Sequence, residues 1–142
     1  MIAYIDSSVV LRIVFGQPGG LPEWGKITRG VTSGLLEVEC LRTIDRLRLV
    51  GSLEEEDLVA RREAVYRILE GLEIVEVSPA ILRRAGQAMP APLGTLDAIH
   101  LSTAELWREI TGNELLMATH DQALALAARA SGFRVLGGRG TQ

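Results

Sequence analysis

The sequence predicts an α/β fold with a mostly parallel central sheet that helices cover on both faces. Short runs of β-branched and aliphatic residues alternate with longer segments of helical periodicity. The 142 residues are the size of one ordinary domain with a sizeable core. Acidic residues also follow predicted strands, where sites form in such sheets. We therefore expect residues 1–142 to form a single domain.

Five short runs, mostly of β-branched or aliphatic residues, are the predicted strands. They cover residues 2–6, 30–32, 73–77, 115–119 and 134–136. Because helical segments separate them, we expect parallel strands joined by crossovers of one hand.

The predicted helices begin with residues 7–15, which a Gly/Pro-rich loop, "GQPGGLPEWG", follows. Residues 33–50 place apolar residues on one helical face. The next helix is expected to start at Ser52, where "SLEEED" has the form of a capping box, and to run to about residue 72. Helices are also expected in "SPAILRRAGQAM", "TLDAIHLSTAELWREITG" and "DQALALAARASG". The last two end at glycines that suit a helix C′ position.

Composition excludes several classes of protein. A net charge of −3 argues against coating nucleic acid by bulk electrostatics, although it leaves room for a local basic strip. Cys40 is the only cysteine, so an internal disulfide is excluded and a reducing compartment is indicated. No apolar run approaches the roughly 18 residues of a membrane span, and no secretion signal is present. We expect a cytoplasmic protein that does not enter membranes.

Four acidic residues are candidates for a common site. Asp6 closes the first predicted strand, Asp121 follows the fourth, Asp97 lies near a helix start, and Glu39 lies about two turns into its helix. Carboxylate oxygens are the ligands that Mg²⁺ and Mn²⁺ prefer, and distant segments can supply them together.

Each acid also has a purely structural interpretation. Asp6 or the serines after it could cap the first helix, and Asp121 could cap the last. Asp97 could complement a helix dipole, and Glu39 could pair with Arg42 three residues on. Taken one by one, these interpretations do not explain why four acidic residues occur together at these particular places in the predicted strands and helices.

At this point the motifs carry a family resemblance. The ordered set "YIDSS", "TSGLLEVECLR", "TLDAIHLSTA" and "ATHDQALALAARASG" resembles a PIN domain, and most closely the VapC toxins of bacterial and archaeal toxin–antitoxin pairs. "DSS" alone is weak, whereas "LDAIHLSTA" followed at the right distance by "THDQAL" is fairly specific. The resemblance spans nearly the whole chain and implies a three-layer α/β/α fold with a metal-dependent endoribonuclease site.

The resemblance assigns site residues one by one. It implies a catalytic and metal-binding set of Asp6, Glu39, Asp97 and Asp121. Ser7 and Thr119 occupy the positions of supporting hydroxyl residues. Glu37 is an alternative to Glu39, but the "VE" context favours Glu39.

The resemblance also implies cofactors and partners. One or two Mg²⁺ or Mn²⁺ ions would promote hydrolysis of RNA phosphodiester bonds, leaving 5′-phosphate and 3′-hydroxyl ends. The expected partners are an RNA substrate, a VapB-like antitoxin and a second copy of the chain in a homodimer. Trp24 and Trp107 are candidate interface anchors, although Trp107 suits a core position better. No Walker glycine loop is present, since "GLPEWG" and "LGGRG" lack its lysine, so no nucleotide cofactor is expected.

RNA contacts would have to be local. Glu39, Arg42 and Arg46 share one side of a helix, and Arg12 lies beyond Asp6 on another. These three arginines are candidate phosphate contacts. The alternative is ordinary salt bridging to Asp45, Glu37 or Glu39.

Two other functions stay open at this stage. His100 and His120 could act as a metal-free general acid–base pair that leaves a cyclic phosphate, although a packing or supporting role suits His100 better. The chain could also be a degenerate PIN-like module that binds a partner without cleavage. A receiver domain is disfavoured because Lys26 is the only lysine, and an Asp-x-Asp phosphatase because position 8 is Ser8.

Overall fold

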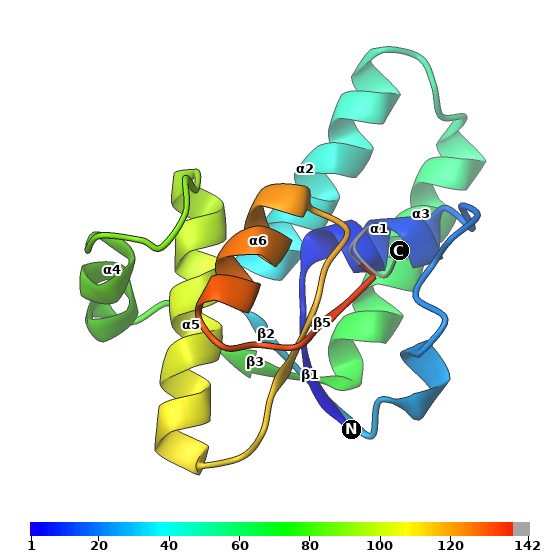
Figure 1. Cartoon of the computed structure of the whole chain (residues 1–142). Coiled ribbons are helices and arrows are strands. Elements are labelled where there is room, and N and C mark those ends of the chain that lie inside the picture. The colour runs from blue at the N-terminus through cyan, green and yellow to red at the C-terminus, as the bar shows by residue number, and fades with distance from the viewer. Residues whose placement is uncertain (138–142) are drawn as a thin grey trace.

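The structure is a computed structural model that describes residues 1–137. Within this range it contains six α-helices and a five-stranded sheet of order β3-β2-β1-β4-β5 (Figure 1). The strands are β1 (Ile2–Ile5), β2 (Arg29–Ser33), β3 (Leu72–Val75), β4 (Leu116–Ala118) and β5 (Val135–Leu136). All four pairings are parallel, which confirms the predicted sheet. The "LGGRG" segment continues into residues 138–140, which lie outside the described residues.

Strand β1 is the centre of the sheet. It pairs with β2 on one side, with Ala3 opposite Gly30, and with β4 on the other, with Ala3 opposite Leu116. The backbone N–H of Asp6 extends the second pairing by donating to the carbonyl of Ala118 at 3.1 Å. The sheet therefore grows in opposite directions from β1, and the carboxyl end of β1 lies at the switch point where parallel sheets form sites.

The helices form a layer on each face of the sheet, which confirms the three-layer α/β/α fold. They are α1 (Ser7–Val14), α2 (Leu35–Leu49), α3 (Glu55–Glu70), α4 (Pro79–Ala85), α5 (Thr95–Thr111) and α6 (Gln122–Ala130). Side chains alternate along β1, so Ala3 and Ile5 pack with α1, α2 and α3, whereas Tyr4 packs with α5 and α6. Helix α4 packs on α5, and α2 and α3 lie side by side (Figure 1).

Two helix boundaries depend on local chemistry that the sequence patterns only partly indicate. The helix expected at Ser52 begins instead at Glu55, because the Ser52 N–H donates to the carbonyl of Leu47 and so completes the end of α2. Residue Glu54 precedes α3 without a side-chain cap, and three acids in the first turn complement the helix dipole instead. The predicted terminal glycine of α5 is confirmed, since Gly112 has φ of 68°.

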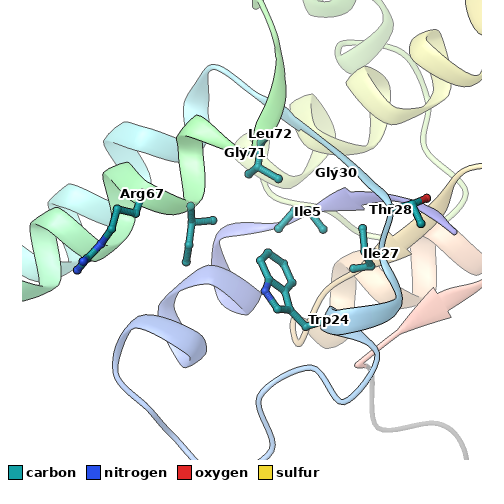
Figure 2. Close-up of a pocket in the computed structure, with 9 residues that line it drawn as sticks. Ile5, Trp24, Ile27, Thr28, Gly30, Arg67, Gly71 and Leu72 are labelled. Atoms are coloured by element: carbon teal, nitrogen blue, oxygen red, sulfur yellow. The ribbon is translucent and has the colours of Figure 1, made fainter.

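The Gly/Pro-rich loop contains a short 3₁₀ helix, η1 (Trp24–Lys26), that the sequence patterns did not predict. Trp24 lines an apolar cavity of about 360 Å³ beside the starts of β2 and β3, together with Ile27 and Leu72 (Figure 2). Trp107 is 6% exposed and belongs to the core on the α5 side, which agrees with the core position that its sequence neighbours favour. None of the helices in residues 1–137 is long and apolar enough to cross a membrane.

A glycine substitution tests how α5 ends. Gly112→Ala places a Cβ in the left-handed region, so we expect the free energy of unfolding to fall by about 1 kcal/mol. Gly25→Ala is the matched control, because an added Cβ there meets no atom within 4 Å and the residue does not have positive φ. Urea denaturation of both variants measures the difference. Equal stability of the two variants would contradict the role of Gly112.

Candidate active site

Four acidic residues from separate segments line one cavity of about 460 Å³: Asp6, Glu39, Asp97 and Asp121. They come from the end of β1, from α2, from the first turn of α5 and from the start of α6. No lysine or arginine of the described residues lines this cavity. The structure therefore gathers four carboxylates that have no basic partner within the cavity.

Asp6 is 3% exposed, and hydroxyl groups hold one of its two oxygens. Its Oδ2 accepts hydrogen bonds from Ser8 Oγ at 2.7 Å and from Thr119 Oγ1 at 2.8 Å. Asp6 occupies the N-cap position of α1, where its carbonyl accepts a hydrogen bond from the N–H of Val9 at 3.1 Å, but its side chain makes no capping hydrogen bond. Its buried carboxylate instead faces the site, with Oδ1 4.0 Å from His100 Nε2.

Thr119 joins the ends of β1 and β4 at the site. Its Oγ1 donates to Asp6 and accepts from the backbone N–H of Asp121 at 3.0 Å. Asp121 Oδ1 in turn accepts from the N–H of Leu124 at 2.8 Å, which confirms that Asp121 caps α6. Asp121 therefore caps the last helix and also lines the acidic cavity.

Glu39 is held by a histidine rather than by an arginine. His100 Nε2 lies 2.5 Å from Glu39 Oε1, although the two residues are 61 positions apart in the chain. The alternative in which Glu39 pairs with Arg42 is wrong, because Arg42 pairs with Asp45 at 3.1 Å, which confirms the salt-bridge alternative for this arginine. Glu37 is exposed, so the structure places Glu39 and not Glu37 at the cavity.

The concentration of negative charge shifts the protonation of nearby groups. Burial, followed by the charges of Asp121 and Asp6, raises the pKa of Asp97 to about 6. Burial, followed by the charges of Glu39 and Asp6, raises the pKa of the Cys40 thiol to about 12. Burial acts to lower the pKa of His100, but its hydrogen bond to Glu39 and the surrounding carboxylates raise it overall. In all three groups the neighbouring carboxylates act to raise the pKa, in addition to the effect of burial.

The donor set fits a hard divalent cation. The cavity presents carboxylate oxygens and hydroxyls but no thiolate, and Cys40 is buried in the core. Among residues 1–137 no three acidic, histidine or cysteine side chains are already close enough to hold one ion. The chemistry of the donors therefore suits Mg²⁺ or Mn²⁺. For one ion to bind three of the described carboxylates, those side chains would have to move closer together.

A second cavity, of about 530 Å³, adjoins the acidic one and shares Ser7, Glu39 and Leu96 with it. Arg42 and Arg46 line this second cavity, which we call the arginine groove. Both side chains are exposed, and an exposed ion pair such as that of Arg42 with Asp45 contributes little stability. They are therefore available to a phosphate.

Several predicted site residues lie elsewhere or act through neighbours. Arg12 lines neither cavity and instead donates to the carbonyl of Gly19 at 3.5 Å. Ser7 lines both cavities, but the hydroxyl that contacts Asp6 belongs to Ser8, which sequence reasoning considered only as a helix cap. His120 is partly buried and its Nδ1 donates to the carbonyl of Gly137 at 2.9 Å.

The chain is similar to known proteins both in sequence and in fold. Residues 3–130 match the family model of the PIN domain. The chain is 30% identical over 138 residues to ribonuclease VapC47 of Mycobacterium tuberculosis, with 92% of each protein covered. Its fold resembles a toxin–antitoxin complex from Klebsiella pneumoniae with a TM-score of 0.66, 16% identity and coverage of 90% of this chain and 93% of that chain. It also resembles FitAB bound to a DNA fragment, with a TM-score of 0.68, 14% identity and coverage of 95% and 93%.

The raised pKa of Asp97 predicts a stabilising substitution in the metal-free protein. The ionised carboxylate is disfavoured in the folded state above a pH of about 6, so Asp97→Asn should raise the free energy of unfolding there by about 1 kcal/mol. The gain should shrink as the pH falls toward 4, because Asp97 is then protonated in the folded protein. Thermal or urea denaturation in EDTA measures it.

Asp57→Asn is the matched control, because Asp57 has the same position in the first turn of α3 and is exposed. Its substitution should change stability by less than about 0.5 kcal/mol. A loss of stability in Asp97→Asn at pH 8 would contradict the raised pKa of Asp97.

Proposed function

We propose, since this chain belongs to the PIN-domain family, that it is a metal-dependent endoribonuclease and the toxin of a toxin–antitoxin pair. The observation that carries the proposal is the group of four carboxylates that line one cavity without a basic residue among the described lining. Support also comes from the relative named ribonuclease VapC47 and from the toxin–antitoxin complex of similar fold. A partner antitoxin, which is expected to cover the acidic cavity, and a homodimer belong to the same proposal.

Asp6 and Asp97 would hold one or two Mg²⁺ or Mn²⁺ ions directly, and Glu39 and Asp121 directly or through water. When bound, such an ion supplies positive charge to the phosphate and lowers the pKa of water for attack. The hydroxyls of Ser8 and Thr119 occupy Asp6 Oδ2, which leaves Oδ1 for a ligand.

The chain's own residues prepare the site before substrate arrives. Thr119 fixes Asp6 relative to Asp121, so the carboxylates at the ends of two strands keep one spacing. The Asp121 side chain cannot swing away, because its Oδ1 also caps α6. Preorganised side chains of this kind need less reorganisation during reaction.

Phosphates of the RNA would lie along the arginine groove, with Arg42 and Arg46 as contacts next to the acidic cavity. This placement offsets the overall negative charge of the chain at the one place where RNA must bind. Arg12 is outside the groove and carries no part of the proposal.

The metal-free histidine mechanism is disfavoured by burial. His100 is completely buried and does not line the acidic cavity, so it cannot reach an RNA 2′-hydroxyl. The degenerate-module alternative is favoured only by the spacing of the carboxylates, of which no three among the described residues are close enough to hold one ion. The presence of all four acids in one cavity supports the enzyme instead.

Cleavage of RNA tests the proposal. The antitoxin-free chain, incubated with total RNA and Mn²⁺, should produce fragments with 5′-phosphate and 3′-hydroxyl ends, and EDTA should abolish them. Asp97→Asn should reduce the rate by at least about 100-fold, because a bound metal contributes several kcal/mol of charge stabilisation. Asp57→Asn is the control and should cleave normally. Cyclic-phosphate ends, or full activity in EDTA, would contradict the proposal.

Salt dependence of RNA binding tests the arginine groove. Arg42→Ala and Arg46→Ala should each weaken RNA binding and reduce the slope of log affinity against log salt by about 0.7 for a single-stranded ligand. Arg48→Ala is the control on the same helix, because Arg48 lines neither cavity and pairs with Asp45. Fluorescence anisotropy over a salt series, with Asp97→Asn as the inactive background, gives the slopes. An equal change in the Arg48 variant would contradict a local phosphate site.

A further inference from the structure

His100 contacts the acidic site without lining it. It is completely buried on α5, and its two ring nitrogens have different partners. Nε2 lies 2.5 Å from Glu39 Oε1, and Nδ1 lies 2.6 Å from the hydroxyl of Tyr4. A fully buried histidine with a polar partner on both nitrogens is held in one orientation.

The backbone places these three residues together. Tyr4 and Asp6 are two residues apart at the end of β1, so both side chains lie on the α5 side of the sheet. His100 follows Asp97 by three residues and so lies one turn along the same face of α5. The Tyr4 and His100 rings pack edge to face with centroids 5.8 Å apart, which fixes the imidazole between sheet and helix.

The donors and acceptors of these groups determine the direction of the hydrogen bonds. An ionised Glu39 only accepts hydrogen bonds, so His100 Nε2 must carry the proton that lies between them. In the neutral ring Nδ1 accepts from the Tyr4 hydroxyl, and in the protonated ring Nδ1 donates to the Tyr4 oxygen, so Tyr4 is the partner of Nδ1 in either state. Two hydrogen bonds, Tyr4–His100 and His100–Glu39, thus connect the centre of the sheet with the edge of the cavity.

These hydrogen bonds also explain why Glu39 does not pair with an arginine. Arg42 lies three residues after Glu39 on α2, a spacing that favours an ion pair. His100 instead engages Glu39 Oε1, while Arg42 pairs with Asp45. Glu39 lines the acidic cavity, and no hydrogen bond among the described residues involves its Oε2. A Glu39 bound to arginine would be a poorer ligand for a cation.

We propose that His100 is a positioning residue that holds Glu39 toward the acidic cavity and away from Arg42, and that Tyr4 orients His100. This role rests on the proposed function, because its purpose is to keep Glu39 available to a divalent cation. Under this proposal, the buried residues His100 and Tyr4 support metal binding without contacting the metal.

Mn²⁺ titration by calorimetry, without RNA, tests the proposal through paired substitutions. His100→Gln keeps a donor near the position of Nε2, whereas His100→Asn keeps a polar atom near Nδ1 and loses the contact to Glu39. We expect His100→Asn to weaken Mn²⁺ binding by about 10-fold or more, and His100→Gln to restore most of the affinity. Tyr4→Phe should weaken binding by a smaller factor, because the ring stays in place while Nδ1 loses its partner.

Ser102→Ala is the matched packing control, since Ser102 is buried on the same helix and its hydroxyl has no partner among the described residues. It should bind Mn²⁺ as the unmodified chain does. Melting curves in EDTA identify any variant that fails to fold. If His100→Asn does not fold, Tyr4→Phe carries the test, because it preserves the aromatic core.

The outcomes separate this role from the proposed function. Equal Mn²⁺ affinity in the unmodified chain, His100→Asn and Tyr4→Phe would overturn the positioning role and leave the proposed function standing. Equal weakening by His100→Asn and His100→Gln would also overturn it, because it would show that the imidazole acts only by filling the core. Absence of Mn²⁺ binding by the unmodified chain would overturn the proposed function, and the positioning role with it.

Discussion

Parallel hydrogen bonding of β1 to β2 on one side and to β4 on the other determines where the chemistry of this protein lies. Because the sheet grows in opposite directions from β1, the chain segments after β1 and β4 meet at one edge. Asp6 and Asp121 reach the acidic cavity directly from these segments, and α5 brings Asp97 to the same place. The alternation of side chains along β1 then directs Tyr4 and Asp6 toward α5 and so toward His100.

The site works against the stability of the protein that carries it. Four carboxylates surround one cavity whose described lining has no basic residue, and Asp6 is almost completely buried among hydroxyl donors. Hydroxyls offset only part of the unfavourable free energy of burying a charge. Burial, followed by the charges of Asp121 and Asp6, raises the pKa of Asp97, which shows a similar cost at a second carboxylate. Under the proposed function a divalent cation would offset this cost, so affinity for metal and instability without metal would have one physical cause.

Local patterns were enough to predict the order of strands and helices, the terminal glycine of α5 and the cap that Asp121 provides for α6. Those features depend on neighbours in the sequence. The Glu39–His100 contact joins residues 61 positions apart and replaces the pairing of Glu39 with Arg42 that local spacing allows, a choice that only tertiary structure decides. Helix rotation decides two further features that sequence spacing alone does not determine. Ser8 contacts Asp6 where Ser7 does not, and Arg12 does not line the arginine groove.

Anomalous X-ray scattering from crystals grown with Mn²⁺ would test most directly whether the gathered carboxylates form a metal site. An anomalous peak in the acidic cavity, bonded to oxygens of Asp6 and Asp97, is the result that we predict. Asp6 Oδ2 should keep its hydrogen bonds to Ser8 and Thr119 while Oδ1 faces the ion. Manganese found only at other surface sites, with an intact acidic cavity that contains none, would contradict the central claim.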